Sequence, residues 1–108
     1  MFDKGKKTIK EGIDTTNFEW KGAKEAVDKA DLTCLGYMLY TSKFGKGVAL
    51  ACNDGCFYRL PSRYVADFEN CSDADREYIM SGEKVEFRTY TTQSGSETII
   101  AAIGGKDI

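Results

Sequence analysis

The stretch LTCLGYMLYTSKFGKGVALACNDGCFYRL, residues 32–60, decides the fold. Its segments 32–40, 48–52 and 56–60 are rich in apolar and aromatic residues, which is typical of strands. Gly36 lies in the middle of the first segment and predicts a bend or a β-bulge there. Between the second and third segments, Asn53-Asp54-Gly55 supplies residues that tolerate a positive φ. This stretch therefore predicts three consecutive antiparallel strands, the last two joined by a tight hairpin.

A helix and two further strands follow. Tyr64, Val65 and Phe68 have helical spacing, and Ser72 with Asp75 approximates a capping box. Gly82 predicts the end of this helical region, and residues 83–92 and 97–103 predict strands joined by a polar turn.

The flanking segments set the expected domain limits. Residues 1–16 are polar and lysine-rich without a clear period, so we expect a flexible lead. NFEWKG, residues 17–22, alternates apolar and charged residues and predicts a short strand. We expect one domain over residues 17–103 and a short tail over 104–108.

The order of elements from residue 32 is strand, strand, strand, helix, strand, strand. A mainly β chain with one helix between the third and fourth of five antiparallel strands has the order of the OB-fold, a small Greek-key barrel. A long first strand bent at a glycine suits a barrel, because that strand must pair on two sides. The sequence therefore predicts a five-stranded, OB-fold-like antiparallel barrel. An open antiparallel sheet with a helix on one face is the alternative that periodicity leaves open.

Composition narrows the function. The chain has 108 residues, a net charge of −2 and no histidine. Without histidine, Ser-His and Cys-His nucleophile pairs are excluded, and an enzyme is the class least expected. There is no apolar run of membrane-spanning length and no apolar signal region near the N-terminus, so we expect a cytoplasmic protein without a membrane partner.

The four cysteines, Cys34, Cys52, Cys56 and Cys71, raise the question of zinc or disulfides. A four-cysteine zinc site usually has two close pairs, whereas this chain has one close pair and two distant cysteines. A Cys52–Cys56 disulfide would close a very short loop and constrain the unfolded chain little. We therefore expect no metal and no cofactor, and we interpret Cys52 and Cys56 as small apolar residues at a hairpin tip.

Several short pieces occur in a set order over residues 18–103: FEWKG (18–22), SKFG (42–45), LPSRYV (60–65), IMSGEK (79–84) and FRTYTTQSG (87–95). In this order the chain resembles small single-stranded-DNA-binding proteins encoded by phages and prophages of Gram-positive bacteria. The resemblance implies an OB-fold and the coating of exposed single strands during replication or recombination. The four cysteines and the short tail differ from the usual pattern of that family.

Binding of single strands without sequence preference requires cations for the phosphates and flat rings on which bases stack. In OB-folds the site lies on the second and third strands and the neighbouring loops. Cys56, Tyr58 and Leu60 form the more apolar side of the third strand, which leaves Phe57 and Arg59 outside; a core position for Phe57 is the alternative. The candidate nucleic-acid-binding residues are Tyr37, Tyr40, Lys43, Phe44, Lys46, Phe57, Arg59, Arg63, Arg88 and Tyr90.

These observations predict a protein that binds single-stranded DNA without sequence specificity. Phage or host replication and recombination proteins are the candidate protein partners, and the oligomeric state is open, a homodimer included. Two other functions fit the same sequence. An acidic stretch, residues 67–77, also suits a module that binds and inhibits or recruits a host protein, and an OB-type site can take RNA as well as DNA.

Overall fold

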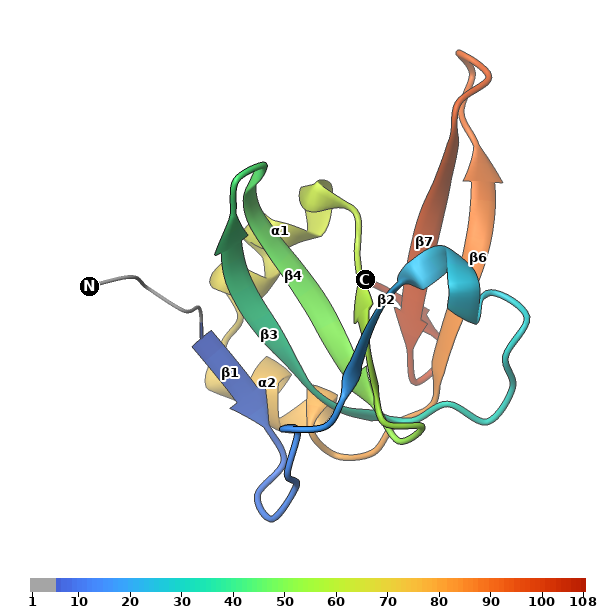
Figure 1. Cartoon of the computed structure of the whole chain (residues 1–108). Coiled ribbons are helices and arrows are strands. Elements are labelled where there is room, and N and C mark those ends of the chain that lie inside the picture. The colour runs from blue at the N-terminus through green and yellow to red at the C-terminus, as the bar shows by residue number, and fades with distance from the viewer. Residues whose placement is uncertain (1–5) are drawn as a thin grey trace.

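The computed structural model describes residues 6–108, and within this range the chain is mainly β, as the sequence predicts (Figure 1). Its strands are β1 (Lys6–Ile9), β2 (Glu19–Gly22), β3 (Cys34–Ser42), β4 (Gly45–Cys52), β5 (Cys56–Arg59), β6 (Val85–Thr91), β7 (Glu97–Ile103) and β8 (Lys106–Asp107). Its helices are the 3₁₀ helices η1 (Ala23–Ala26) and η2 (Ser62–Tyr64) and the α-helices α1 (Val65–Glu69) and α2 (Asp73–Ile79).

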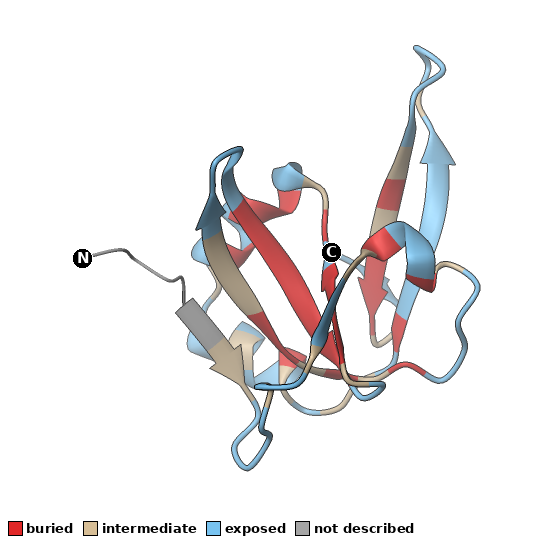
Figure 2. Cartoon of the chain, in the orientation of Figure 1, coloured by how far each residue is buried: buried red, intermediate tan, exposed pale blue. Residues whose placement is uncertain are grey.

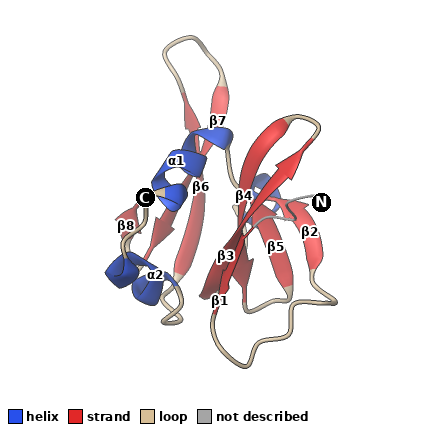
Figure 3. Ribbon diagram, turned by 90° about the vertical axis from the view of Figure 1, so that its left-hand side faces the viewer, coloured by secondary structure: helices blue, strands red, loops and turns tan. Residues whose placement is uncertain are grey.

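The strands form two sheets. The larger has the order β1-β3-β4-β5-β2, in which every pair is antiparallel except β2 with β5, and the smaller is the antiparallel sheet β6-β7-β8. A single bridge between Thr33 and Lys84 joins them at one end. Figure 3 shows the two sheets as separate layers, and α1 and α2 pack on β3 and β4 of the larger sheet.

The five-stranded closed barrel is therefore not what forms, because strand edges that would have to meet are already occupied. The outer edge of β5 pairs with β2. Side chains form hydrogen bonds with backbone groups on the free edge of β7. Arg63 donates to the Ile99 carbonyl, and the Ala101 N–H donates to the Tyr64 hydroxyl at 3.1 Å. Backbone groups paired in these ways are not available to close a barrel.

Segments outside the predicted strands also pair. Of the expected flexible lead, residues 6–9 form β1 on the edge of β3, while residues 1–5 lie outside the described residues. In the expected tail, β8 pairs with β7. The single predicted helix is two α-helices in the predicted place, because Ser72 starts a new helix at α2 by accepting the Asp75 N–H at 3.1 Å.

Gly36 has the role expected from the sequence. The register of β3 on β4 shifts between Cys34 and Gly36, which marks a bulge. Gly36 has φ +148°, and a Cβ at this position would lie 2.1 Å from the Thr8 carbonyl oxygen on β1. Only glycine lets the two backbones approach this closely.

The predicted β4–β5 hairpin is present, with Cys52 opposite Cys56 and Gly55 at φ +80°. Cys34 lies opposite Cys52 on the next strand, so three buried thiols form a row across β3, β4 and β5. All four cysteines are free. Burial raises the pKa of the Cys34 thiol to about 12, which keeps it protonated and apolar in character.

The larger sheet is buried on both faces at its centre, as the red colour of β4 and β5 shows in Figure 2. Side chains at alternate positions, among them Tyr37, Leu50 and Tyr58, point into the main core with α1, α2 and the smaller sheet. The intervening positions, among them Ala49, Ala51 and Phe57, form a smaller cluster on the opposite face. We call that second side the outer face; the candidate site lies on it.

Candidate nucleic-acid interface

Phe44 occupies the tip of the β3–β4 hairpin. The strands pair up to Ser42 and Gly45, so Lys43 and Phe44 are the whole connection. The Ser42 hydroxyl accepts a hydrogen bond from the Phe44 N–H at 3.1 Å, and Gly45, which follows the turn, has a φ of +106°. The Phe44 side chain is 89% exposed, and the Lys43 ammonium lies 5.1 Å from its ring centroid. A ring this exposed contributes little to the core and is available to a ligand.

A row of rings crosses the outer face below this tip. Trp20 on β2 stacks on Phe57 of β5, with ring centroids 4.7 Å apart and 26° between their planes. Its other contact is with Tyr40 of β3, edge-on at 5.3 Å. Trp20 remains 41% exposed, so its ring packs on Phe57 on one side and is open to solvent elsewhere.

Small residues on β4 make room for this row. Tyr40 lies opposite Gly47 in the register of β3 on β4, and a Cβ at Gly47 would be 2.4 Å from the Tyr40 ring. Ala49 and Ala51 continue the same face of β4. With no large side chain in between, Tyr40 reaches across the strand toward Trp20.

Together these residues line a groove on the outer face. Its rings come from Trp20, Tyr40 and Phe44, and its cations from Lys46 and Arg59. We call this surface the aromatic groove; its remaining lining residues are Ser42, Gly45, Gly47, Leu60 and Ser62.

The cations in the aromatic groove, and Lys43 beside it, differ in how they are paired. Within residues 6–108, Lys43 and Arg59 take part in no ion pair. Arg59 lies opposite Ala49 of β4 and Gly22 of β2, and it is exposed. Lys46 pairs with Glu69 at 3.1 Å but keeps most of its side chain in water. Exposed pairs of this kind are weak, so Lys46 can exchange Glu69 for a phosphate at little cost.

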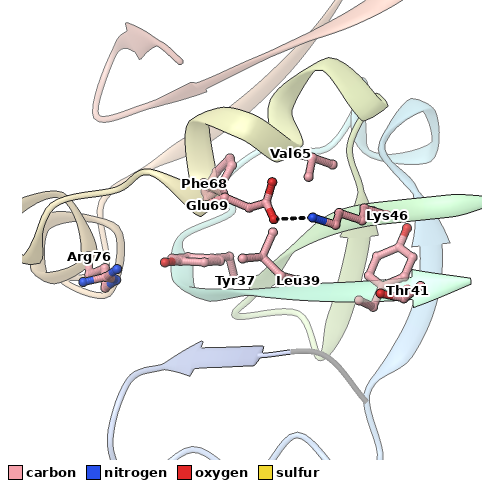
Figure 4. A pocket seen from close by; sticks show the side chains of 10 residues that line it. Tyr37, Leu39, Thr41, Lys46, Val65, Phe68, Glu69 and Arg76 are labelled. Carbon is pink, nitrogen blue, oxygen red and sulfur yellow. Dashed lines mark hydrogen bonds and ion pairs between the residues drawn. The ribbon is translucent and has the colours of Figure 1, made fainter. Parts of the chain in front are cut away.

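Tyr37 and Phe57, both predicted as site residues, are buried. Tyr37 is 1% exposed because it points to the core side of β3, where it packs on Phe68 at 4.8 Å between ring centroids. Figure 4 shows Tyr37 below α1, in a pocket that the Lys46–Glu69 pair crosses. Phe57 is on the outer face as expected, but it is 2% exposed because Trp20 covers it. Neither ring is accessible to a base.

Arg63 forms hydrogen bonds within the protein, with residues of β7. It donates to the Thr98 hydroxyl at 2.7 Å and to the Ile99 carbonyl, and its guanidinium lies 4.7 Å from the Tyr64 ring centroid. These contacts fasten η2 to the free edge of β7. Arg63 does not line the aromatic groove.

Arg88 and Tyr90 belong to the other sheet. Both lie on the face of β6 opposite Val85 and Phe87, which are buried in the core. Arg88 forms an ion pair with Asp107 of β8, and Tyr90 is exposed. Neither lines the aromatic groove.

The residue that sequence reasoning missed is Trp20. Its alternation with Phe18 predicted a strand, but its place on the edge of the larger sheet depends on the parallel pairing of β2 with β5. No local pattern encodes that long-range pairing. The available signal was the pair of aromatic residues, Phe18 and Trp20, in a short segment that also carries Glu19 and Lys21.

A second polar cluster lies at the far end of the larger sheet. Lys29 donates to the Tyr58 hydroxyl at 2.8 Å and to Asp54 at 3.2 Å, and Tyr58 donates to Asp54. Partial burial opposes ionisation of Asp54, but the hydrogen bonds from Tyr58 and Lys29 outweigh it and lower the pKa of the carboxyl. Burial and the bond to Asp54 raise the pKa of Tyr58. The cluster ties the loop after η1 to the β4–β5 hairpin.

Comparison with protein-family models, with curated proteins and with solved structures gave no match to this chain. Within residues 6–108, no group of histidine, cysteine or acidic side chains is arranged to hold a metal ion. None of the helices in that range is long and apolar enough to cross a membrane.

Proposed function

We propose that this chain binds single-stranded DNA without sequence specificity, with the aromatic groove as its site. The observation that carries the proposal is the coincidence of exposed rings and unpaired cations on one face. Trp20, Tyr40 and Phe44 offer stacking surfaces, and Lys43 and Arg59 lie beside them without acidic partners among the described residues. Flat rings next to cations are what sequence-independent binding of single strands requires.

Magnitudes support the proposal for a chain with a net charge of −2. Stacking of one base contributes about 1–3 kcal/mol, so two or three rings suffice for micromolar binding or better once a few phosphates are held. Apart from Glu69, which pairs with Lys46, the acidic residues of α1 and α2 belong to helices that cover the core face of the larger sheet. Glu69 is therefore the one acidic residue of these two helices that is paired with a lining residue of the groove.

We also propose that the fold is an opened relative of the OB arrangement. Support comes from the order β3, β4, β5, two helices, β6, β7, and from the bridge of Thr33 to Lys84 between the starts of β3 and β6. In this interpretation β2 pairs with the edge of β5 at which a closed barrel would continue, so the two sheets stay separate. The chain would coat single strands during phage replication or recombination, as the resemblance of its sequence pieces implies.

The test is fluorescence anisotropy of labelled oligo-dT titrated with the folded protein at low and at moderate salt. We expect saturable binding at low salt that weakens as salt rises. Oligo-rU of equal length in the same assay tells whether the sugar matters. A folded sample that leaves oligo-dT anisotropy unchanged at low salt would refute the proposal.

A further inference from the structure

A second pocket lies away from the aromatic groove, where α1 and α2 meet the end of β7. Its floor and walls are apolar and come from Phe68, Cys71, Ile79 and Ile103. Tyr78 and Ile108 complete it, and both are among the large apolar residues that remain exposed, at 40% and 38%. Large apolar side chains left exposed around a hollow mark an interaction site more often than isolated ones do.

The rim of this pocket is acidic. Asp67 of α1 and Asp75 of α2 line it, and no cation does. Within residues 6–108 neither carboxylate takes part in an ion pair; Asp75 accepts only the Ser72 N–H at 3.3 Å as part of the helix cap. Arg76, next to Asp75 in the sequence, pairs with Asp73 and lines a different pocket. We call this surface the acidic pocket.

We propose that the acidic pocket is a docking site for a basic segment of a partner protein. The segment would insert one large apolar side chain between Phe68, Ile79 and Ile103, and its flanking lysines or arginines would approach Asp67 and Asp75. Charge complementarity selects this partner, because the two rim carboxylates are unpaired and the pocket holds no opposing cation. An acidic segment or a nucleic acid would be repelled there.

The acidic pocket and the aromatic groove lie on opposite sides of the larger sheet. The helices that form the pocket pack on the core face of β3 and β4, whereas the groove is on the outer face. A strand held in the groove therefore leaves the pocket open. One molecule can hold single-stranded DNA and a basic partner segment together, although docking itself does not depend on DNA binding.

The test is a titration of ¹⁵N-labelled full chain, followed by NMR, with three short peptides. Each has a central Leu, Phe or Trp flanked on both sides by lysines and arginines. We expect at least one peptide to shift the amide signals of Cys71, Ile79 and Ile103 in a saturable way, and to slow alkylation of Cys71 by N-ethylmaleimide by about fivefold. Peptides with the central residue replaced by Ser, or with Glu for every Lys and Arg, should bind about tenfold more weakly or not at all.

Variants make the assignment specific. Asp67→Lys reverses one rim charge on an exposed position and should weaken peptide binding by about tenfold. Glu97→Lys makes the same charge change at the start of β7, about 20 Å along the strand from Ile103, and should leave it unchanged. Saturating oligo-dT should not displace the peptide.

Three results would overturn the proposal. The first is no saturable shift with any of the three basic peptides at about 2 mM, a concentration that detects even very weak docking. The second is binding that Asp67→Lys and Glu97→Lys weaken equally, which would indicate general charge attraction. The third is a concentration-dependent shift of the pocket signals without peptide, which would identify a second copy of the chain as the occupant.

Discussion

Replacing Phe44 with alanine separates binding from folding more cleanly than any other change in the aromatic groove. The side chain is 89% exposed at a hairpin tip, so almost none of its apolar area leaves water on folding. We therefore expect the free energy of unfolding to change by no more than about 0.5 kcal/mol. The loss of one stacking ring removes about 1–3 kcal/mol of binding free energy. In dissociation constants, this is a weakening of about 5- to 150-fold for oligo-dT.

Tyr90→Ala is the matched control. Tyr90 is an exposed aromatic residue near a hairpin tip, like Phe44, but it belongs to β6 and lies outside the aromatic groove. Both variants and the parent chain would be titrated against the same labelled oligo-dT by fluorescence anisotropy, with urea unfolding measured in parallel. Equal weakening by the two variants, or an unchanged affinity in Phe44→Ala, would refute the assignment of the site.

Four further predictions follow from the same contacts. Three phosphate contacts, from Lys43, Lys46 and Arg59, give a slope of about −2 for log K against log salt, and Arg59→Ala should reduce it to about −1.4; an unchanged slope excludes Arg59 from the phosphate path. Gly47→Ala places a Cβ where the Tyr40 ring lies, so it should displace that ring and weaken oligo-dT binding by several-fold with little effect on the urea midpoint. Burial raises the pKa of the Cys34 thiol to about 12, above the unfolded value of about 8.5. The contribution of this thiol to the free energy of unfolding is therefore fully present below pH 8.5 and is lost as pH rises toward 12, by up to about 1.4 kcal/mol per pH unit. Cys34→Ala should show a shallower decline in the free energy of unfolding between pH 8.5 and 10.5. In the native protein only Cys71 should react readily with N-ethylmaleimide, although burial and Asp75 raise its pKa, and mass spectrometry should show four alkylated thiols after unfolding and one before.

The local features of the fold could be predicted from the sequence because short-range chemistry determines them. The bulge at Gly36, the Asn53-Asp54-Gly55 turn and the Ser72 cap each depend on residues a few positions apart. The apolar character of Tyr58 and its neighbours predicted which side of β5 faces the core. The strand order along the chain followed from the same alternation.

The closure of the sheets could not be predicted in this way. It depends on which strand takes the free edge of β5, and β2 takes it after a long-range parallel pairing. That pairing brings Trp20 into the aromatic groove and covers Phe57 with it. It also explains why the predicted site residues separate, since Arg63 is drawn to the open edge of β7 and Arg88 faces away on β6.

The most direct test of the central claim uses the one tryptophan of the chain, which lies in the aromatic groove. Trp20 fluorescence would be followed during titration with unlabelled oligo-dT, alongside anisotropy of the labelled strand. If bases stack in the groove, the Trp20 emission should be quenched with the same dissociation constant that anisotropy gives. Binding seen by anisotropy that leaves Trp20 emission unchanged would contradict the account.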